Sequence, residues 1–275
     1  MQEQVIHNRF KDAPWFPEKE EMVMVGGAGG IGSWLTFFLA RASFKPVVYD
    51  FDTIEEHNLG GQLFRKKDIG KFKVIALYDI ILDYCGEEIN TSCDKITSNS
   101  PTHHFMFSAF DNMQARKDLF NVWKKSIPGC PVTPIFIDGR LIMEQLQIFC
   151  VTPASMDEYE RDHLFNDSEV EDAPCTMKQT SHSAAMIATH MIGFFTNHMT
   201  NIYEREIVRD VPFFYEFFIP VSFTDISNAE PLVKLEDNSI LETEAAPSQE
   251  LEESELSTLI DDTEEISEER EEVEE

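Results

Sequence analysis

The sequence predicts an α/β fold with a mostly parallel sheet, helices on both faces and antiparallel strands late in the chain. Two observations favour this class. Short apolar runs typical of strands alternate with longer segments of helical spacing through the first half of the chain. A glycine-rich stretch separates the first apolar run from the first helical segment, which is typical of a tight turn between a strand and a helix.

The elements follow in chain order. Residues 22–25 form an apolar run that predicts the first strand, and residues 31–42 have the spacing of the helix that follows it. Residues 47–49 predict a second short strand, which ends at Asp50. Further segments continue the alternation, with helices expected at 73–84 and 112–125 and strands at 105–108 and 133–137.

After residue 138 the alternation stops. Residues 141–143 and 146–151 predict consecutive strands. The polar residues 152–173 have no clear period, so we interpret them as a long surface loop, a kind of segment that often carries function. A helix is expected again at 183–198, and the aromatic run 213–223, interrupted by a proline, fits two late strands.

The charge of the chain excludes several classes of partner. Among 275 residues there are 22 Lys and Arg against 51 Asp and Glu, a formal net charge of −29. Such a field repels nucleic-acid backbones and anionic lipid headgroups, so we expect neither nucleic acid nor a membrane as a partner. The N-terminal residues lack the apolar core of a signal peptide, and the longest apolar run, 184–195, is too short to span a bilayer. A cytoplasmic protein is therefore expected.

The same charge divides the chain into parts. Residues 236–275 hold 18 Asp and Glu and a single base, Arg270, so we expect a disordered acidic tail there. The tail either solubilises the protein or docks on a basic partner. Residues 1–20 are expected to be an N-terminal arm, and residues 21–235 a single domain.

A phosphate-binding turn is the clearest local motif. Residues 25–33 contain G-x-G-x-x-G on Gly27, Gly29 and Gly32, where glycine lets the backbone turn tightly and approach phosphate oxygens at a helix N-terminus. Asp50 lies 18 residues after Gly32 at a strand end, where a carboxylate can accept the ribose hydroxyls. This predicts a Rossmann-like nucleotide site, which an NAD or FAD oxidoreductase would also have. The sequence lacks G-x-x-x-x-G-K-[ST], which excludes a P-loop NTPase.

Four further motifs follow the glycines in order. They are D-F-D-T-I starting at Asp50, N-L-G-G-Q ending at Gln62, D-I-G-K-F-K ending at Lys73, and S-A-F-D-N ending at Asn112, with Arg116 after it. This ordered set resembles the ThiF/MoeB and ubiquitin-activating enzyme superfamily over about residues 22–225. Members adenylate the C-terminal carboxylate of a small protein or peptide. The resemblance implies a ThiF-type ATP-binding adenylation domain, with a ubiquitin-like or sulfur-carrier protein or peptide as its partner, and a homodimer.

The resemblance also assigns roles to single residues. It implies that Asp50 binds the ribose, that Asn58, Gln62 and Lys73 contact the triphosphate of ATP, and that Asp111 holds Mg²⁺. The chemistry fits, because attack of a carboxylate on a phosphate brings two anions together and depends on cations and oriented donors. By their local sequence alone, Lys73 is equally a surface lysine and Asp111 a helix N-cap.

One position departs from the family pattern. Members usually have arginine immediately before the glutamine of the second motif, and here that residue is Gly61. Arg65 is a candidate to reach the same phosphates, and Arg9 lies where related dimers send an N-terminal arginine into the partner's site. The alternative is a non-catalytic scaffold subunit that needs a second chain to supply the active site.

Cys175 is the candidate nucleophile. It follows Pro174 just before the helix expected at 183–198, and residues 152–180 resemble the crossover loop that carries the catalytic cysteine of ubiquitin-activating enzymes. A helix N-terminus and Lys178 would favour its thiolate, which could attack the acyl-adenylate to form a thioester. An ordinary loop cysteine is the other interpretation. The five cysteines form no C-x-x-C pair, so neither a zinc site nor a disulfide framework is expected.

Overall fold

The computed structural model describes residues 9–17, 20–142, 144–166, 180–204, 206, 208–219 and 223–226. All of these residues belong to one compact unit of the chain, which ends before residue 233. Cys175 and the expected acidic tail at 236–275 lie outside the described residues.

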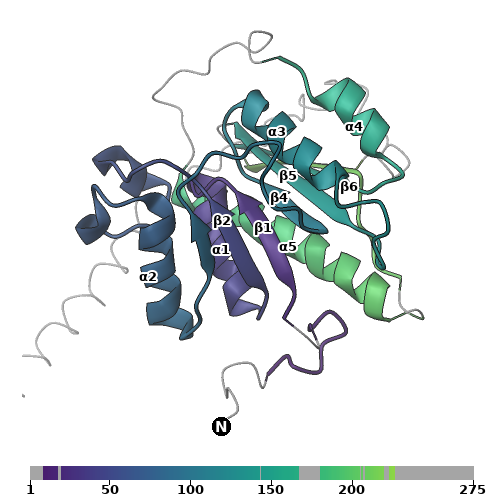
Figure 1. The fold of residues 1–275 in the computed structure, drawn as a ribbon, viewed down its shortest axis with the longest axis horizontal. Coiled ribbons are helices and arrows are strands. Elements are labelled where there is room, and N and C mark those ends of the chain that lie inside the picture. The colour runs from purple at the N-terminus through teal and green to yellow at the C-terminus, as the bar shows by residue number, and fades with distance from the viewer. Residues whose placement is uncertain are drawn as a thin grey trace, which may run out of the picture. The chain divides into compact units, whose positions relative to one another are not determined.

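Within the described residues, eight strands form one sheet in the order β3-β2-β1-β4-β5-β6-β7-β8 (Figure 1). Neighbours from β3 to β5 are parallel, whereas β5 to β8 pair antiparallel. This confirms the predicted mostly parallel α/β fold with late antiparallel strands. The bounds are β1 (Met22–Gly26), β2 (Lys45–Tyr49), β3 (Asn90–Ser92), β4 (Phe105–Ser108), β5 (Ile135–Ile142), β6 (Gln145–Val151), β7 (Phe214–Phe218) and β8 (Phe223–Ile226).

The described helices are α1 (Gly30–Arg41), α2 (Lys73–Cys85), α3 (Met113–Lys124), α4 (Met156–His163) and α5 (Ser181–Tyr203), with short 3-10 turns η2 (Glu56–Gly60) and η3 (Lys66–Asp68). Four of them match predicted helices. The interpretation of 152–173 as a loop was wrong where α4 lies, because that polar helix buries a single side chain, Tyr159, and so shows no apolar period. None of the described helices combines the length and apolarity needed to cross a membrane.

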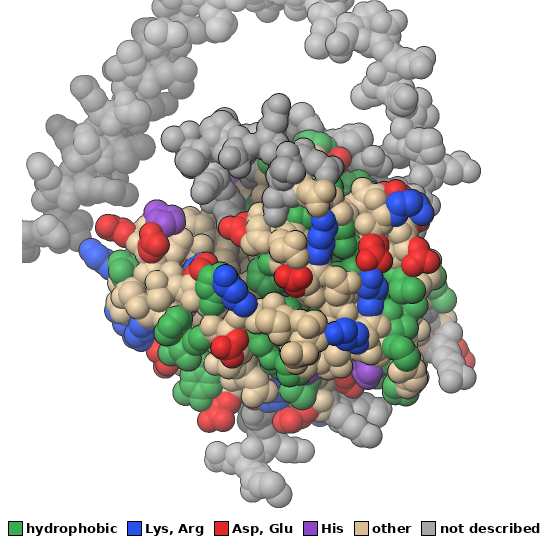
Figure 2. All heavy atoms as spheres, turned by 45° about the horizontal axis from the view of Figure 1, so that its top comes forward, with side chains coloured by type: hydrophobic (Ala, Val, Ile, Leu, Met, Phe, Trp, Pro, Cys, Tyr) green, Lys and Arg blue, Asp and Glu red, His purple; other side chains and the backbone are tan. Residues whose placement is uncertain are grey.

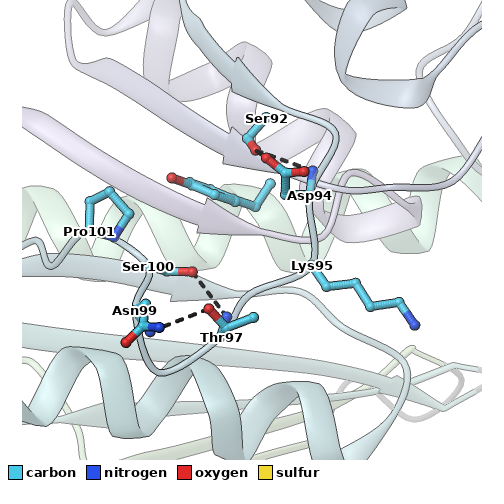
Figure 3. Close-up of a pocket in the computed structure, with 8 residues that line it drawn as sticks. Ser92, Asp94, Lys95, Thr97, Asn99, Ser100 and Pro101 are labelled. Carbon is cyan, nitrogen blue, oxygen red and sulfur yellow. Dashed lines mark hydrogen bonds between the residues drawn. The ribbon is translucent and has the colours of Figure 1, made fainter.

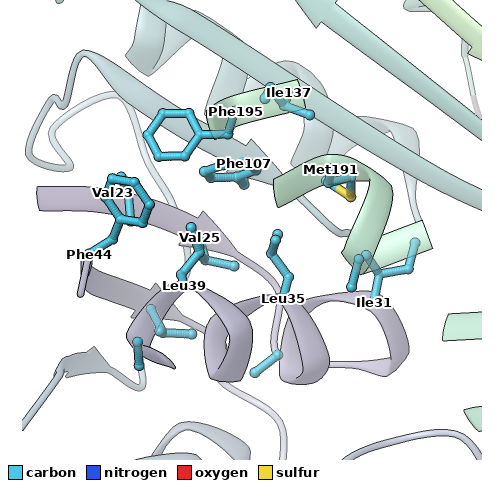
Figure 4. Close-up of a cluster of buried hydrophobic side chains, with 14 of the residues drawn as sticks. Val23, Val25, Ile31, Leu35, Leu39, Phe44, Phe107, Ile137, Met191 and Phe195 are labelled. Atoms are coloured by element: carbon cyan, nitrogen blue, oxygen red, sulfur yellow. The ribbon is translucent and has the colours of Figure 1, made fainter. Parts of the chain in front are cut away.

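Alternate strand residues bury two separate cores, one on each face of the sheet. Val23 and Val25 of β1 pack with α1, α2 and α5, whereas Met24 packs with α3 and Tyr159 of α4. Figure 4 shows the first core, where side chains of α1 meet those of β1 and α5. A Cβ at Gly139 in β5 would lie 2.5 Å from Met191 Sδ, so glycine there lets α5 pack closely on the sheet.

The carboxyl ends of the parallel strands define the edge where ligands bind in folds of this type. β1 and β4 end at Gly26 and Ser108, which pair with each other, and β2 and β3 end at Tyr49 and Ser92, which also pair. The loops that follow these four strands therefore converge. Figure 2 brings the top of Figure 1 forward, and basic and acidic side chains are interspersed on the face that it shows.

Candidate active site

The glycine turn after β1 depends on glycine at two positions. Gly27 has a φ of +91°, and a Cβ there would lie 2.9 Å from the Ala109 carbonyl oxygen. A Cβ at Gly32 would lie 1.8 Å from the Gly27 carbonyl oxygen. The surroundings of Gly29 are open, with Gln62 Nε2 as the nearest atom at 4.0 Å. The turn is thus locked by Gly27 and Gly32 and leaves space beside Gly29 at the N-terminus of α1.

Asp50 ties this turn to the segment after β2. Its side chain is buried, and its two carboxylate oxygens accept hydrogen bonds from the Ala28 N–H at 2.7 Å and the Asp52 N–H at 2.8 Å. Burial raises the pKa of Asp50 above its ordinary value, although nearby Lys73 and the two N–H donors oppose the rise. Each carboxylate oxygen has a second lone pair, so these bonds leave Asp50 able to accept a ribose hydroxyl as well.

A pocket of about 350 Å³ brings together four residues that the sequence analysis assigned to the triphosphate and its metal. They are Asn58, Gln62, Lys73 and Asp111. The pocket is completed by residues that were not predicted as site residues, namely Asp52, Thr53, Glu55, His57 and Gly61. Asp52 lies within the D-F-D motif, which was a signal for it, whereas nothing in the sequence distinguished Glu55 and His57 from ordinary loop residues.

Lys73 is the cation of this pocket. Its side chain is only 9% exposed, so the alternative of an ordinary surface lysine does not hold. The Nζ atom donates a hydrogen bond to Asp52 Oδ2 at 2.8 Å, and the Lys73 N–H donates to the Asp52 carbonyl at 2.9 Å. The side chain of Asp52 is half exposed. An anion entering the pocket therefore has to compete with Asp52 for the ammonium group.

The loop that carries Asn58 and Gln62 is fastened to α1. The Trp34 indole N–H donates to the Gly61 carbonyl at 3.2 Å, and the Leu63 N–H donates to Ser33 Oγ at 3.0 Å. Asn58 Oδ1 accepts from the Glu55 N–H at 2.9 Å, which fixes that side chain.

Gln62 contributes an unusual group to the pocket. Its Oε1 atom is buried and has no hydrogen-bond partner among the described residues, while its Nε2 atom points toward the open side of Gly29. A buried acceptor without a donor is unfavourable unless a ligand, ion or water satisfies it. The unpartnered Oε1 of Gln62 is therefore the feature of the pocket that indicates a bound group most directly.

Asp111 follows β4 and precedes α3. The N-cap of α3 is Asn112, whose Oδ1 accepts from the Ala115 N–H at 2.8 Å, so the alternative of Asp111 as the N-cap is wrong. Asn112 Nδ2 also donates to Asp111 Oδ1 at 3.3 Å. The carboxylate of Asp111 is thus exposed to the pocket rather than used to close the helix.

Neither candidate arginine lies in this pocket. Arg65 donates to Asp68 Oδ2 and Asp83 Oδ2, both at 2.8 Å, and does not line the pocket. Arg9 is exposed in the N-terminal segment, next to Phe10.

The N-terminal segment packs at the other edge of the sheet. Phe10 stacks on Trp15 with ring centroids 5.6 Å apart, and Trp15 lies against Phe44. Phe44 directly precedes β2, so it lies at the amino end of that strand. Arg9 of one chain therefore lies far from the pocket of the same chain, at the opposite edge of the sheet.

A second pocket of about 480 Å³ lies at the carboxyl ends of β2 and β3. Figure 3 shows Ser92 and Asp94 on one side and Thr97, Asn99 and Ser100 on the other. The remaining lining residues are Tyr49, Lys95 and Pro101. Sequence reasoning missed this pocket because a polar loop without a motif gives no signal.

Hydrogen bonds and a ring contact hold the loop around the second pocket. Ser92 Oγ donates to Asp94 Oδ2 at 3.0 Å, and the Lys95 ammonium lies 4.6 Å above the ring of Phe51. Burial, and to a smaller degree Asp94, raises the pKa of Tyr49. Tyr49, the residue before Asp50, lines the second pocket, and Asp52, two residues after Asp50, lines the first.

The four described cysteines are free. Cys85 and Cys150 are buried, and burial raises the pKa of both thiols, so neither has the character of a nucleophile. Among the described residues there is no group of three side chains suited to hold a metal ion.

Comparison with known proteins places this geometry in context. The ThiF family matches the chain over residues 19–217. The fold is similar to that of E. coli MccB, with a TM-score of 0.59 and 15% identity, covering 82% of this chain and 69% of that chain. PaaA has a TM-score of 0.54 and 18% identity, and the match covers 80% of this chain and 74% of PaaA. The E. coli tRNA N6-threonylcarbamoyladenosine dehydratase TcdA was solved in complex with ATP. Its TM-score is 0.52 and its identity 14%, and the match covers 71% of this chain and 92% of TcdA. MccB has also been solved with ATP and with MccA.

Proposed function

Because the chain belongs to the ThiF family, we propose that it is an ATP-dependent adenylyltransferase that activates the C-terminal carboxylate of a ubiquitin-like or sulfur-carrier protein or of a peptide. Family membership supports an ATP-dependent adenylating enzyme and removes the basis for the oxidoreductase alternative. The observation that carries the proposal is the pocket that gathers Lys73, Asp111, Asn58 and Gln62 beside the glycine turn. The complexes of MccB with ATP and with MccA support a nucleotide and an acceptor bound by one such fold.

In this proposal ATP lies along the carboxyl edge of the sheet. The triphosphate occupies the space beside Gly29 and the first pocket, where the N-terminus of α1 and the Lys73 ammonium face it. Asp50 accepts the ribose hydroxyls, and the base enters the second pocket beside Tyr49. A carboxylate oxygen of the acceptor attacks the α-phosphorus, the bond to the β-phosphate breaks, and pyrophosphate leaves with its electron pair. The Lys73 ammonium group stabilises the negative charge that develops on the phosphates.

The residues of the first pocket fit a magnesium ion. Mg²⁺ takes oxygen ligands and is commonly held by one or two carboxylates together with the phosphates of its nucleotide. Asp111 supplies an exposed carboxylate, and Gln62, whose Oε1 has no partner among the described residues, lines the same pocket. When bound, the ion would neutralise phosphate charge next to the reacting α-phosphorus.

Two further parts of the proposal concern residues beyond this pocket. Cys175 would take the acyl group from the adenylate, forming a thioester and releasing AMP. Arg9 would reach the site of a second copy in a homodimer, since the pocket of its own chain lies at the opposite edge of the sheet. A cytoplasmic location remains part of the proposal.

A scaffold subunit is the second candidate function, and a specific observation favours it. Gly61 lines the first pocket where members of the family usually have arginine, and the guanidinium of Arg65 is bonded to Asp68 and Asp83. A scaffold would depend on a second chain for catalysis.

The test is ATP:pyrophosphate exchange by the purified full chain with Mg²⁺ and a panel of small proteins that end in Gly-Gly. Exchange that depends on one of these carriers is expected, and Asp111→Ala should lower it by about 100-fold. Asp157→Ala, which removes an exposed carboxylate on α4, is the matched control and should leave it unchanged. Exchange that appears only when a second chain is added, and that then survives Asp111→Ala, would favour the scaffold.

A further inference from the structure

Arg116 is a buried cation that lines neither pocket. Its side chain is 8% exposed, although it lies only five residues after the expected magnesium ligand, Asp111. One terminal nitrogen donates to Asp138 Oδ1 and, at 3.1 Å, to the Gly139 carbonyl, and the other donates to the Phe110 carbonyl. The guanidinium therefore joins the middle of β5 to the turn that follows β4.

Asp138 holds this guanidinium in place. Its side chain is fully buried, and its other oxygen accepts from Arg140 Nε at 2.7 Å and from the Tyr159 hydroxyl at 2.9 Å. Burial alone would raise the pKa of Asp138, but Arg116 and Arg140 outweigh it and keep the pKa below its ordinary value. Asp138 is therefore charged, and Arg116 has a fixed partner.

The residues on both sides of Asp111 in the chain are held by such contacts. Arg116 fixes the carbonyl of Phe110, the residue before Asp111, and Asn112, the residue after it, caps α3. The Phe110 ring also packs against the glycine turn, because a Cβ at Gly26 would lie 2.6 Å from it. The exposed carboxylate of Asp111 thus stands on a backbone whose position depends on Arg116.

We propose that Arg116, clamped by Asp138, is the positioning residue for Asp111, and that it sets the affinity of the site for the nucleotide-bound metal without touching either. This rests on the proposed function, in which Asp111 holds Mg²⁺. The planar fork of arginine is needed because a lysine nitrogen has no second, fixed donor with which to join Asp138 to the Phe110 carbonyl.

The experiment is a double-mutant cycle on the full chain with Arg116→Lys and Asp111→Asn. It measures ATP:pyrophosphate exchange as a function of Mg²⁺ concentration, and thermal unfolding of each variant. Arg116→Lys should raise the Mg²⁺ concentration for half-maximal exchange about tenfold, and it should have no further effect when Asp111 is already Asn. Arg161→Lys alters an exposed Arg–Asp pair on α4 and is the matched control, with wild-type metal dependence.

The outcomes separate the inference from the function on which it rests. The inference would be overturned if Arg116→Lys raised the Mg²⁺ concentration for half-maximal exchange by the same factor with and without the Asp111→Asn substitution. Arg116 would then only stabilise the fold. Wild-type protein without exchange would refute the proposed function, and the inference with it. Should Arg116→Lys fail to fold, Tyr159→Phe removes only the hydroxyl that donates to Asp138 and should raise the Mg²⁺ requirement severalfold. An unchanged requirement in that variant would overturn the inference.

Discussion

Gly29 and Gly32 lie three residues apart in one motif, but alanine should impair the protein differently at each. At Gly32 it should destabilise the fold, and at Gly29 it should weaken ATP binding. A Cβ at Gly32 would lie 1.8 Å from the Gly27 carbonyl oxygen, so the backbone has to separate by more than about 1 Å before the side chain fits. Such overpacking costs on the order of 3 kcal/mol. For a domain of this size that corresponds to a fall in Tm of about 6–12 °C.

Gly29→Ala should keep the fold. The nearest atom to a Cβ there is Gln62 Nε2 at 4.0 Å, so there is no clash, but a φ of −76° with a ψ of −144° lies outside the regions that alanine prefers. We expect this backbone strain to cost about 1 kcal/mol and to lower Tm by about 2–4 °C. The added methyl group would occupy the space in which the phosphates are expected and weaken ATP binding by about tenfold. Thermal denaturation and ATP titration of both variants check this. A Gly32→Ala protein with wild-type Tm, or a Gly29→Ala protein that binds ATP normally, would refute the reasoning.

Three further predictions follow from the described contacts. Lys73→Met should lower exchange about 100-fold, whereas Asp52→Asn, which removes the carboxylate bonded to Lys73 Nζ, should tighten binding of metal-free ATP, as measured by calorimetry with EDTA. Burial lowers the pKa values of His103, His163, His190 and His198, so the folded state resists protonation. Their contribution to stability is complete above the unfolded pKa of about 6.5 and is lost as the pH falls below it. Denaturant titrations at pH 7 and 5 should show this loss, and His198→Gln should reduce it. Asp138→Asn leaves two buried guanidinium groups without a charged partner and should destabilise the fold by about 3–5 kcal/mol. Asp162→Asn breaks the exposed pair with Arg161 and should barely change Tm.

The parts of the site that the sequence predicted belong to short local motifs. The glycine turn and Asp50 stand at fixed offsets from a strand end or a helix start, and the pairing of the strands brings them to one edge. Offsets of this kind survive without any knowledge of distant contacts. Lys73 was assigned through the resemblance to the ThiF family, because its local sequence fits a surface lysine equally well.

The parts that were missed depend on contacts between distant segments. Arg65 resembled a free phosphate ligand because the 3-10 turn that brings Asp68 onto its side chain, and the position of Asp83 on α2, both depend on the folded chain. β3 has three polar residues and becomes a strand only through pairing with β2. The buried cluster around Asp138 joins residues from β5, α3 and α4, and its charged side chains had no apolar pattern that could mark them as core.

The charges of the first pocket explain why the missing arginine matters. Three carboxylates, those of Asp52, Glu55 and Asp111, line it together with Lys73, and one of them already neutralises the ammonium group. A triphosphate entering this pocket meets an excess of like charge, which the N-terminus of α1 offsets only in part. A divalent cation that arrives with the nucleotide reverses the balance, because the same carboxylates then become ligands or counter-charges for it. In the proposed function, phosphate binding would therefore depend less on a fixed side chain at position 61 and more on the metal, so the position of Asp111, and hence of Arg116, would matter more than in a site with its own arginine.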